Sequence, residues 1–600
     1  MSEDGGMNML SYKRDYYCGL LNESMAGQTV HLSGWVQRTR DLGGLVFVWL
    51  RDREGLVQLV FDEAVCSHEV FELGRALRSE YVVTCTGEVR MRAENAVNPD
   101  LPTGKVEVFV RECELLNKSE TPPIYIDDKA EENETVRLKY RYLDLRKPSL
   151  QRNLRMRAKI ASAVRAYMDG QGFAEVETPV LTKSTPEGAR DFLVPSRLHP
   201  GSFYALPQSP QIYKQLLMLA GFDKYYQLAR CFRDEDNRAD RQPEFTQVDV
   251  EMSFIDEKDI QTVIEGAFQR VFHDVMGMEI QLPLERITWR EAMENYGSDK
   301  PDRRFGMLLK NASDLCEGCG FPVFEDAVKE GKCVRGINAE GCADMTRKQI
   351  DSLVEFVKTY RAKGLAYVTY TADGGVKSSF NKFLTPEFAE KLRERFSAKP
   401  GDILFFVADK DAVAFQSLGA LRIEIARRRG LIPEGVYDLF WVTEFPLFEY
   451  SEEEGRYVAM HHPFTSWMPE DEAYLENEKD KVRARAYDLV MNGIEMGSGS
   501  IRIHRSDMQA KMFKMIGLSD EEAQHRFGFL TDAFKYGTPP HGGFAFGLDR
   551  LSMILTGSDS LRDVVAFPKA QGANCLMMET PADVNPDQLE ALKIKVDLGE

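Results

Sequence analysis

Hydrophobic and polar positions alternate in two runs near the middle of the chain, and this pattern predicts a long antiparallel hairpin. The runs are Tyr225–Arg233 and Glu244–Phe254, on either side of the charged loop Asp234–Pro243. Alternate side chains of a strand face opposite ways, so one face of the second run is mostly apolar: Thr246, Val248, Val250, Met252 and Phe254. The other face carries Phe245, Gln247, Asp249, Glu251 and Ser253. This pattern fits either an amphipathic surface hairpin or a strand that presents a polar site.

Five short strand-like runs near the N-terminus predict a small closed barrel. They are Thr29–Arg38, Leu45–Asp52, Leu56–Phe61, Tyr81–Arg90 and Lys105–Val110, and a helical stretch, Cys66–Leu77, follows the third. This order is typical of an OB-fold, a barrel that binds oligonucleotides on one face. Unpaired bases are recognised by stacking and by hydrogen bonds to their edges, and suitable side chains are Arg38, Arg40, Phe47 and Gln58. Each of them alone also fits a structural role.

The remaining patterns predict a mixture of helices and strands. A basic amphipathic helix begins near Leu150, and the run ALPQSPQIYKQLLM begins as a strand and becomes a helix after Ser209 and Pro210. Between about 301 and 434 we expect helices at Arg347–Lys363 and Pro386–Phe396 and strands at Ala366–Tyr370 and Asp402–Ala408. Further on we expect a helix at Glu478–Met491 and a glycine-rich turn at Gly497–Ser500.

Composition indicates an ordinary water-soluble protein of several domains. Of the 600 residues, 43% are hydrophobic and 28% are charged. No run approaches the ~18 apolar residues of a membrane span, and the first thirty residues lack the pattern of a signal peptide. We therefore expect a cytoplasmic enzyme with no membrane partner. The ten cysteines are mostly isolated and fit reduced, buried thiols better than a zinc site.

The charge is strongly acidic overall but reverses locally. The formal net charge is −19, which by itself argues against a nucleic-acid partner, although binding depends on the local field. Between Arg137 and Lys159 there are nine Lys or Arg residues and one acid, Asp144. This segment fits a surface for a phosphate backbone, or a helix face whose charges are paired elsewhere in the structure.

Three stretches, in order, resemble the three motifs of class II aminoacyl-tRNA synthetases. FRDED, a loop and RQPEFTQVDVE are similar to motif 2 as it occurs in aspartyl-tRNA synthetases. Ala158–Leu181, with Pro179, is similar to motif 1, and Gly542–Leu551 to motif 3. The resemblance covers essentially the whole chain. It extends to the inserted domain of the bacterial-type, class IIb enzymes, which is also found in a subunit of a tRNA amidotransferase.

The resemblance implies a multidomain α/β fold: an OB-fold barrel, a catalytic domain built on an antiparallel sheet, and an inserted α+β domain. The expected domains are 1–120 (anticodon-binding barrel), 121–150 (hinge), 151–300 (first catalytic part), 301–434 (insertion), 435–565 (second catalytic part) and 566–600 (C-terminal extension). In this family motif 1 forms the subunit interface, so a homodimer is expected. The barrel residues would bind the anticodon of tRNA-Asp, with Phe47 stacking and Gln58 reading a base.

The implied reaction is attack of the L-aspartate carboxylate on the α-phosphate of ATP, followed by acyl transfer to tRNA. Such chemistry asks mainly for positioning and charge neutralisation. A planar guanidinium suits a phosphate, which makes Arg233 the candidate for the α-phosphate. By resemblance, Arg550 holds the γ-phosphate and Phe245 stacks on adenine. Glu235 would contact the nucleotide, and Arg241 would reach the terminal phosphates.

Magnesium is the expected cofactor, since Mg²⁺ takes one or two carboxylates together with phosphate oxygens. Asp488 and Glu495 match the carboxylate pair of the family, with Asp488 near the end of the expected helix and Glu495 just before the glycine-rich turn. Such a turn would let a nucleotide approach the backbone closely. Without the motifs, two acids seven residues apart would be ordinary surface charge.

For the aspartate side chain the resemblance implies a cationic pocket. Arg502 would bind the carboxylate, next to the pair Lys214 and Asp249 and to His461; His462 fits either the site or its support. Positions that hold the ammonium group and the rest of the substrate are Glu187, Ser209, Gln211 and Gln247. Asparagine would leave Arg502 and Lys214 desolvated against a neutral amide, at a cost of roughly 3–5 kcal/mol.

Three alternatives remain for the function. Leu42 stands in RTRDLGG where several non-discriminating enzymes of the family have histidine, which favours an enzyme that charges tRNA-Asp alone. A non-discriminating enzyme would also charge tRNA-Asn and feed an amidotransferase. A synthetase-like paralogue without tRNA charging is disfavoured by the complete barrel and site, and an asparaginyl-tRNA synthetase by Lys214, Asp249 and the insertion.

Overall fold

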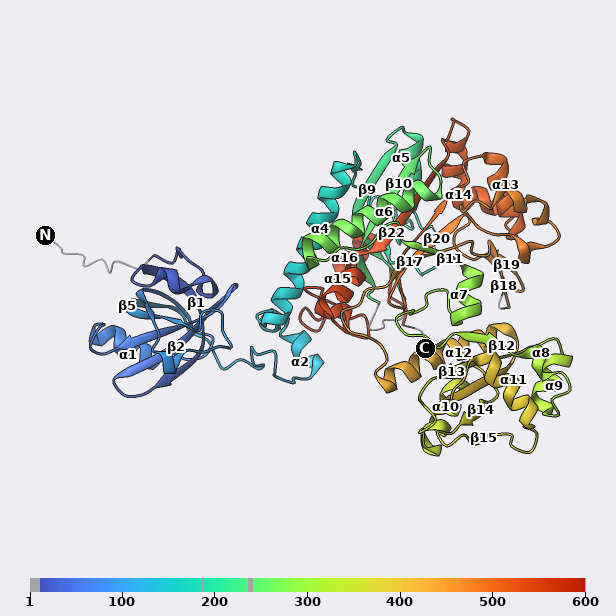
Figure 1. Cartoon of the computed structure of the whole chain (residues 1–600). Coiled ribbons are helices and arrows are strands. Elements are labelled where there is room, and N and C mark those ends of the chain that lie inside the picture. The colour runs from blue at the N-terminus through green and yellow to red at the C-terminus, as the bar shows by residue number, and fades with distance from the viewer. Residues whose placement is uncertain (1–10, 186–187, 236–240, 453, 599–600) are drawn as a thin grey trace. The chain divides into compact units, whose positions relative to one another are not determined.

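The computed structural model describes residues 11–185, 188–235, 241–452 and 454–598 (Figure 1). The chain forms two compact units, one of residues 1–157, 236–242 and 556–584 and the other of residues 158–235, 243–555 and 585–600. Among the described residues, none of the helices combines the length and the apolar character that crossing a membrane requires.

The first unit contains the predicted barrel (blue in Figure 1), closed in the order β1-β2-β3-β5-β4. Its strands are β1 (Thr29–Asp41), β2 (Leu45–Asp52), β3 (Gly55–Asp62), β4 (Val82–Met91) and β5 (Val106–Asn117), and the helix after the third strand is α1 (His68–Ala76). Val46, Val48 and Leu50 of β2 point into a fully buried core. The short helices α2 (Glu134–Lys139) and α3 (Arg141–Asp144) follow the barrel, and α4 spans Pro148–Gly170.

The second unit is built on an eight-stranded sheet in the order β11-β17-β20-β21-β22-β10-β9-β6. Its pairs are antiparallel except β11–β17 and β6–β9, one at each end. The strands are β6 (Ala174–Glu175), β9 (Lys224–Phe232), β10 (Glu244–Ser253), β11 (Glu285–Thr288), β17 (Leu439–Thr443), β20 (Ala486–Met491), β21 (Ile494–Ile501) and β22 (His541–Gly547). The helices of this part are α5 (Gln211–Leu219), α6 (Glu257–Val271), α7 (Trp289–Tyr296), α13 (Ser506–Met515), α14 (Asp520–Phe534) and α15 (Leu548–Thr556). Two further sheets have two strands each: β7 (Leu193–Pro195) with β8 (Phe203–Ala205), and β18 (Phe448–Ser451) with β19 (Arg456–Ala459).

The inserted part has its own five-stranded sheet, in the order β12-β13-β16-β14-β15 (Figure 1). Its strands are β12 (Leu309–Asn311), β13 (Cys333–Ala339), β14 (Ala366–Tyr370), β15 (Val376–Ser378) and β16 (Ile403–Asp409). Its helices are α8 (Ser313–Cys316), α9 (Pro322–Lys329), α10 (Arg347–Lys358), α11 (Pro386–Phe396) and α12 (Asp411–Arg429). The predicted fold class is therefore confirmed, with α12 as a helix that the sequence patterns had not singled out. A last helix, α16, covers Pro586–Leu592.

The hairpin prediction is confirmed as β9 and β10, which pair antiparallel with Phe245 opposite Cys231. One detail is wrong: Phe254 does not continue the apolar face, because the strand ends at Ser253. Phe254 adopts a left-handed backbone conformation, with φ of 57°, and its side chain is 71% exposed.

Two further predictions are wrong, and both concern β20 and β21. The helix expected at Glu478–Met491 is instead a short 3-10 turn at Lys479–Lys481 followed by strand β20. All six residues of β20 are buried, so the strand shows none of the alternation by which a half-buried strand is recognised.

The glycine-rich segment is not a turn but lies inside β21. An added Cβ at Gly497 would lie 2.2 Å from the carbonyl oxygen of Ala545, and one at Gly499 would lie 2.2 Å from that of Gly543. These glycines therefore allow β21 to pack closely against β22.

Candidate active site

The polar face of β10 is buried from Gln247 to Ser253 rather than exposed to solvent. Asp249 and Glu251 are 1% and 0% exposed, and Gln247 is buried as well. On the opposite face Val248 and Val250 are fully buried. Because buried charges in proteins are paired or bind ligands, this strand presents a site and not an amphipathic surface.

Two cations from other elements meet the carboxylates of β10. Lys214 in α5 places its Nζ 2.6 Å from Oδ1 of Asp249 and 3.2 Å from Oε2 of Glu251. Arg502, which follows β21, donates from Nε to Oε1 of Glu251 over 3.0 Å and from a terminal nitrogen to Oγ of Ser500 over 2.7 Å. The result is a buried cluster of two cations and two anions, which we call the charge cluster (Lys214, Asp249, Glu251 and Arg502).

Glu251 is a site residue that the sequence reasoning missed, although its position on the same strand face as Asp249 was the available signal. Its place depends on Gly543, which pairs with it across β10 and β22. An added Cβ at Gly543 would lie 1.8 Å from Oε2 of Glu251. Burial by itself would raise the pKa of Glu251, but Arg502 and Lys214 outweigh burial and hold this pKa below its usual range.

The charge cluster corrects the electrostatic argument made from the sequence. Arg502 and Lys214 are already paired with carboxylates, so an uncharged ligand would not leave them without partners. What the cluster offers is unused donors: Arg502 uses three of its five N–H groups on Glu251 and Ser500, and Lys214 uses two of its three. All of these unused groups are donors, which suits a carboxylate.

Two half-buried histidines, His461 and His462, lie near the charge cluster, and His461 is also near the carboxylates of a second region. His462 lies near Arg502 and Lys214, and burial together with these cations lowers its pKa to about 3. Burial also lowers the pKa of His461, but the carboxylates of Glu495 and Asp299 oppose this shift. In both rings Nε2 is buried and has no hydrogen-bond partner among the described residues. Both histidines are therefore neutral and have an unused nitrogen.

The second region contains the predicted metal carboxylates. Asp488 in β20 is opposite Ser498 of β21, and Glu495 lies at the start of β21. Oδ1 of Asp488 is buried and has no hydrogen-bond partner among the described residues, and burial, followed by the charge of Glu495, raises the pKa of Asp488 well above its usual range. An orphaned buried carboxylate next to a second one suits a divalent cation.

The described residues contain no group of three or more His, Cys, Asp or Glu side chains arranged to hold a metal ion. Asp488 and Glu495 thus fit an ion that brings most of its ligands with it, as Mg²⁺ does when it binds through phosphate oxygens.

The residues predicted for the nucleotide lie at the ends of the hairpin and of β22. The guanidinium of Arg233 lies over the ring of Phe245 at 5.1 Å, and its Nε is buried without a hydrogen-bond partner in the described residues. Arg550 in α15 donates to the backbone oxygen of Glu495 over 2.7 Å. The neighbouring Asp549, which the sequence reasoning missed, accepts from the backbone N–H of Thr246 over 2.9 Å and so joins α15 to β10.

The remaining predicted residues have simpler environments. Oγ of Ser209 accepts from the backbone N–H of Gln211 over 3.2 Å at the start of α5, and Nε2 of Gln211 is buried without a hydrogen-bond partner within the described residues. Gln247 donates to Asp249 over 2.8 Å. Glu235 is half-buried, Arg241 is exposed, and Glu187 lies outside the described residues.

The outer face of the barrel presents the predicted base-binding residues on neighbouring strands. Phe47 is half-buried while Val46 and Val48 beside it are core residues, so its ring belongs to the outer face. Arg40 is opposite Phe47 across β1 and β2, and Arg38 is opposite Trp49, with its guanidinium 5.5 Å from the centre of that ring. Trp49 is an aromatic residue of this face that the sequence reasoning missed.

Two other residues of the barrel were predicted from the sequence to bind or select tRNA. Gln58 is half-buried and donates to Glu107 over 2.8 Å. Leu42, between β1 and β2, is 56% exposed.

Many charges of the basic segment 137–159 are paired within the first unit. Asp144 contacts Arg137, Arg141 and Lys147 at 3.1, 2.7 and 3.3 Å. Arg146 pairs with Glu80 at 2.6 Å, and Arg155 pairs with Glu54 at 3.2 Å. Five of the nine basic residues are therefore paired with carboxylates, which favours the interpretation that this segment is a helix face with paired charges.

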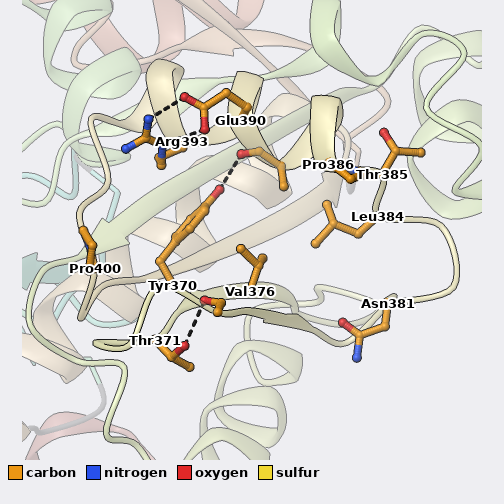
Figure 2. A pocket seen from close by; sticks show the side chains of 13 residues that line it. Tyr370, Thr371, Val376, Asn381, Leu384, Thr385, Pro386, Glu390, Arg393 and Pro400 are labelled. Carbon is orange, nitrogen blue, oxygen red and sulfur yellow. Dashed lines mark hydrogen bonds and ion pairs between the residues drawn. The ribbon is translucent and has the colours of Figure 1, made fainter.

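A separate cavity of about 680 Å³ lies in the inserted part (Figure 2). Tyr370 of β14, Val376 of β15 and Pro386 of α11 are among its lining residues. The hydroxyl of Tyr370 donates to the backbone oxygen of Ala389 over 2.6 Å, and Glu390 and Arg393 pair with each other. No described residue predicted for the active site lines this cavity.

Comparison with protein families identifies two segments. Residues 133–571 match the family described as tRNA synthetases class II (D, K and N), and residues 30–116 match the OB-fold nucleic acid binding domain. A protein named aspartate–tRNA(Asp/Asn) ligase from Caldanaerobacter subterraneus subsp. tengcongensis is 56% identical over 593 residues, which are 99% of this chain and 100% of that protein. One named aspartate–tRNA ligase, from Ruminiclostridium cellulolyticum, is 53% identical over 591 residues, 98% of this chain and 99% of that protein.

Solved structures show the same fold at lower identity. Asparaginyl-tRNA synthetase from Pyrococcus horikoshii, complexed with asparaginyl-adenylate, has a TM-score of 0.57 and 19% identity, over 95% of this chain and 99% of that one. A structure described as a putative aspartyl-tRNA synthetase from Leishmania major has a TM-score of 0.55 and 18% identity, over 91% of both chains.

Proposed function

Because the chain belongs to the class II tRNA synthetases (D, K and N), we propose that it attaches L-aspartate to tRNA in two steps, through an aspartyl-adenylate. The relatives with more than half of their residues identical are named as aspartate–tRNA ligases. The observation that carries the proposal is the buried charge cluster, whose unused hydrogen-bonding groups on Arg502 and Lys214 are all donors.

In this proposal the charge cluster binds the side-chain carboxylate of aspartate. A carboxylate presents two acceptor oxygens to the donors of Arg502, whereas the amide of asparagine would direct an NH₂ group at one of them. A desolvated donor left without an acceptor costs about 1–3 kcal/mol, or roughly 5- to 150-fold in discrimination. Gln211 and Gln247, with Ser209, would hold the rest of the amino acid, as would Glu187.

The nucleotide would lie beside the hairpin. Arg233 would neutralise charge that develops on the α-phosphate, and its unpartnered Nε is a donor available for this purpose. Phe245 would stack on adenine, Arg550 would hold the γ-phosphate, and Glu235 and Arg241 would contact other parts of ATP. Asp488 and Glu495 would hold Mg²⁺, which supplies further neutralisation of the phosphate charge when bound.

The barrel would bind the anticodon through Phe47, with Arg38, Arg40 and Gln58 beside it. When an OB-fold binds single-stranded nucleic acid, bases stack on aromatic rings at its surface. The position of Phe47 on the outer face of the barrel supports such stacking. Phe47→Ala should therefore slow tRNA charging and leave aspartate-dependent pyrophosphate exchange near normal. Motif 1 would form a homodimer interface, which the mass of the protein in solution would test.

The choice between tRNA-Asp and tRNA-Asn divides the proposal into two candidates. Leu42 favours an enzyme for tRNA-Asp alone, as the sequence suggested. The name aspartate–tRNA(Asp/Asn) ligase of a relative at 56% identity favours one that also charges tRNA-Asn.

The deciding experiment is charging of purified tRNA-Asp and tRNA-Asn transcripts with labelled aspartate, side by side. Charging of tRNA-Asp alone supports the discriminating enzyme. Comparable charging of both supports the second candidate and implies an amidotransferase that consumes Asp-tRNA-Asn. Charging of neither would refute the proposed function.

A further inference from the structure

The segment between α7 and β12, Ser298–Met307, reaches the proposed metal site, and the proposed chemistry gives it no role. It reads SDKPDRRFGM and connects the eight-stranded sheet to the inserted part. Nζ of Lys300 lies 3.6 Å from Oε2 of Glu495. Both side chains are partly exposed, Lys300 by 47% and Glu495 by 35%, so this contact is open to solvent and to a ligand.

The neighbouring Asp299 faces the same region. Burial lowers the pKa of His461, and the charges of Glu495 and, to a smaller extent, Asp299 oppose this shift. The pKa of Asp488 is raised mainly by burial and by Glu495, and Asp299 raises it further. Lys300 acts on Asp488 in the opposite direction. Lys300 thus contacts Glu495, with the charges of Asp299 and Asp488 near enough to act on the same region, which in the proposed function must also accept the phosphates of ATP.

The segment is fixed against the strands that carry the metal carboxylates. Gly493 forms the turn between β20 and β21 with φ of 82°, and an added Cβ there would lie 3.0 Å from Cβ of Asp302. Arg303 donates to both carboxylate oxygens of Asp438, over 2.9 and 2.8 Å, and its guanidinium lies 3.7 Å from the ring centre of Phe440. The position of Lys300 is thus tied to the β20–β21 turn.

The inserted part holds the same segment from the other side through Arg422 of α12. Arg422 is 1% exposed and donates to the backbone oxygens of Asp302 and Gly306, over 3.0 Å each, and of Met307 over 3.3 Å. Its guanidinium also lies 4.5 Å from the ring centre of Phe305. Backbone carbonyls and aromatic faces, rather than a buried carboxylate, satisfy this cation.

We propose that Lys300 is a further phosphate-binding residue of the active site, held in place by Arg422 of the inserted part. In the nucleotide-free chain Lys300 pairs with Glu495. When the metal-bound nucleotide occupies the site, Lys300 donates to a terminal phosphate instead, which its flexible stem permits. This inference rests on the proposed function, because it assumes that ATP binds at these carboxylates.

Lys300→Met tests the role through binding rather than through activity. Removing the ammonium group should weaken binding of α,β-methylene-ATP at saturating Mg²⁺ about fivefold, the effect expected for a partly exposed charge contact. The same change should tighten binding of Mn²⁺ alone, because the cation that competes for Glu495 is gone. Calorimetry measures the first and paramagnetic resonance of free Mn²⁺ the second, with Lys300→Arg expected to restore nucleotide binding.

Opposite shifts of the two affinities distinguish phosphate binding from a merely structural role, in which both would fall together. A matched control is Lys535→Met, which removes an exposed lysine paired with Asp532 in α14 and should change neither affinity. Unchanged nucleotide binding in Lys300→Met would overturn the inference. If the unmodified chain fails to bind the nucleotide at all, the proposed function fails instead.

Arg422→Lys tests the link to the inserted part. Lysine keeps the charge but loses the planar fork that reaches several carbonyls, so nucleotide binding should weaken in the same direction as in Lys300→Met. Adding Arg422→Lys to Lys300→Met should cause no further loss, since both act through Lys300. Additive losses in the double variant would show that Arg422 acts by another route, and an unchanged affinity in Arg422→Lys that folds normally would remove the inserted part from the proposal.

Discussion

The charge cluster and the metal carboxylates are neighbouring parts of one sheet, and they treat buried charge in opposite ways. In the charge cluster each carboxylate has a cation within 3.2 Å; the pKa of Glu251 is lowered, although burial raises that of Asp249. At the metal carboxylates Asp488 has an orphaned buried oxygen and a raised pKa. A pocket that must recognise one side chain is organised before the ligand arrives, whereas a site for a cation and phosphates is left unsatisfied without them.

The largest expected effect on the contrast between the charge cluster and the metal carboxylates is that of replacing Arg502. Arg502→Leu removes the donors for the substrate carboxylate and leaves Glu251 with Lys214 alone. Breaking a buried ion pair costs roughly 3–5 kcal/mol, so aspartate-dependent pyrophosphate exchange should fall by about 10²–10³·⁵. Binding of an ATP analogue, followed by calorimetry, should stay largely intact because the side chain of Arg502 donates to Glu251 and Ser500 rather than to the residues proposed for the nucleotide.

An equal loss of aspartate activation and of nucleotide binding in Arg502→Leu would refute a specific role in the side-chain pocket. Thermal unfolding of the variant serves as the control for folding, and Arg502→Lys, which keeps the charge, should lose less activity.

Glu251→Gln tests whether the charge cluster is held together by its own charges. The amide keeps the shape but leaves Arg502 and Lys214 short of one anion, so the free energy of unfolding should drop by about 3 kcal/mol. Since the folded pKa of Glu251 lies below its unfolded value of about 4.3, its stabilisation is present above that value and is lost as the pH falls through the folded pKa.

The measurement is denaturant unfolding of the wild-type chain and of Glu251→Gln between pH 3 and pH 8. The difference in stability should be constant from about pH 5 upward and should shrink below about pH 4. A difference that grows as the pH falls would contradict the pairing.

Part of this site could be predicted from the sequence, and the reasons for the rest are physical. The period of two along β10 placed Gln247 and Asp249 on one face, and the motif resemblance indicated Arg502 and Lys214, which contact that face in the structure. The contact of Arg502 with Glu251 joins residues 251 positions apart, and no local pattern encodes such a pair. The role of Glu251 was therefore missed.

The strand β20 was missed for a different reason. A strand buried on both faces has no polar positions, so its period is hidden, and the charged residues before it suggested a helix. Similarly, the glycines of β21 suggested a turn, but they are there because β22 packs too closely for a Cβ. Turn and strand glycines look alike in a sequence, since only the neighbouring strand distinguishes them.

Gly543→Ala tests whether the close packing of β22 against β10 fixes the position of the Glu251 carboxylate. The new methyl group would overlap Oε2 of Glu251 and must push it away from Lys214 and Arg502. Overpacking of this kind costs about 1–3 kcal/mol, and aspartate-dependent exchange should fall while nucleotide binding remains. Gly557→Ala is unsuitable as a control because its φ is positive, but Gly170→Ala at the end of α4 has open space and should be close to neutral.

Asp488→Asn should change the free energy of unfolding least, and it should raise this free energy where the changes in the charge cluster lower it. The opposite sign distinguishes the two regions. Replacing an orphaned buried carboxylate by a neutral amide removes a desolvated charge, so the free energy of unfolding without ligand should rise by about 1 kcal/mol. The same variant should lose Mg²⁺-dependent adenylate formation. Thermal unfolding in the absence of metal and nucleotide measures the first, and pyrophosphate exchange at several Mg²⁺ concentrations measures the second. A less stable Asp488→Asn chain would mean that the carboxylate supports the fold, and that stability and ligand binding are not opposed at this site.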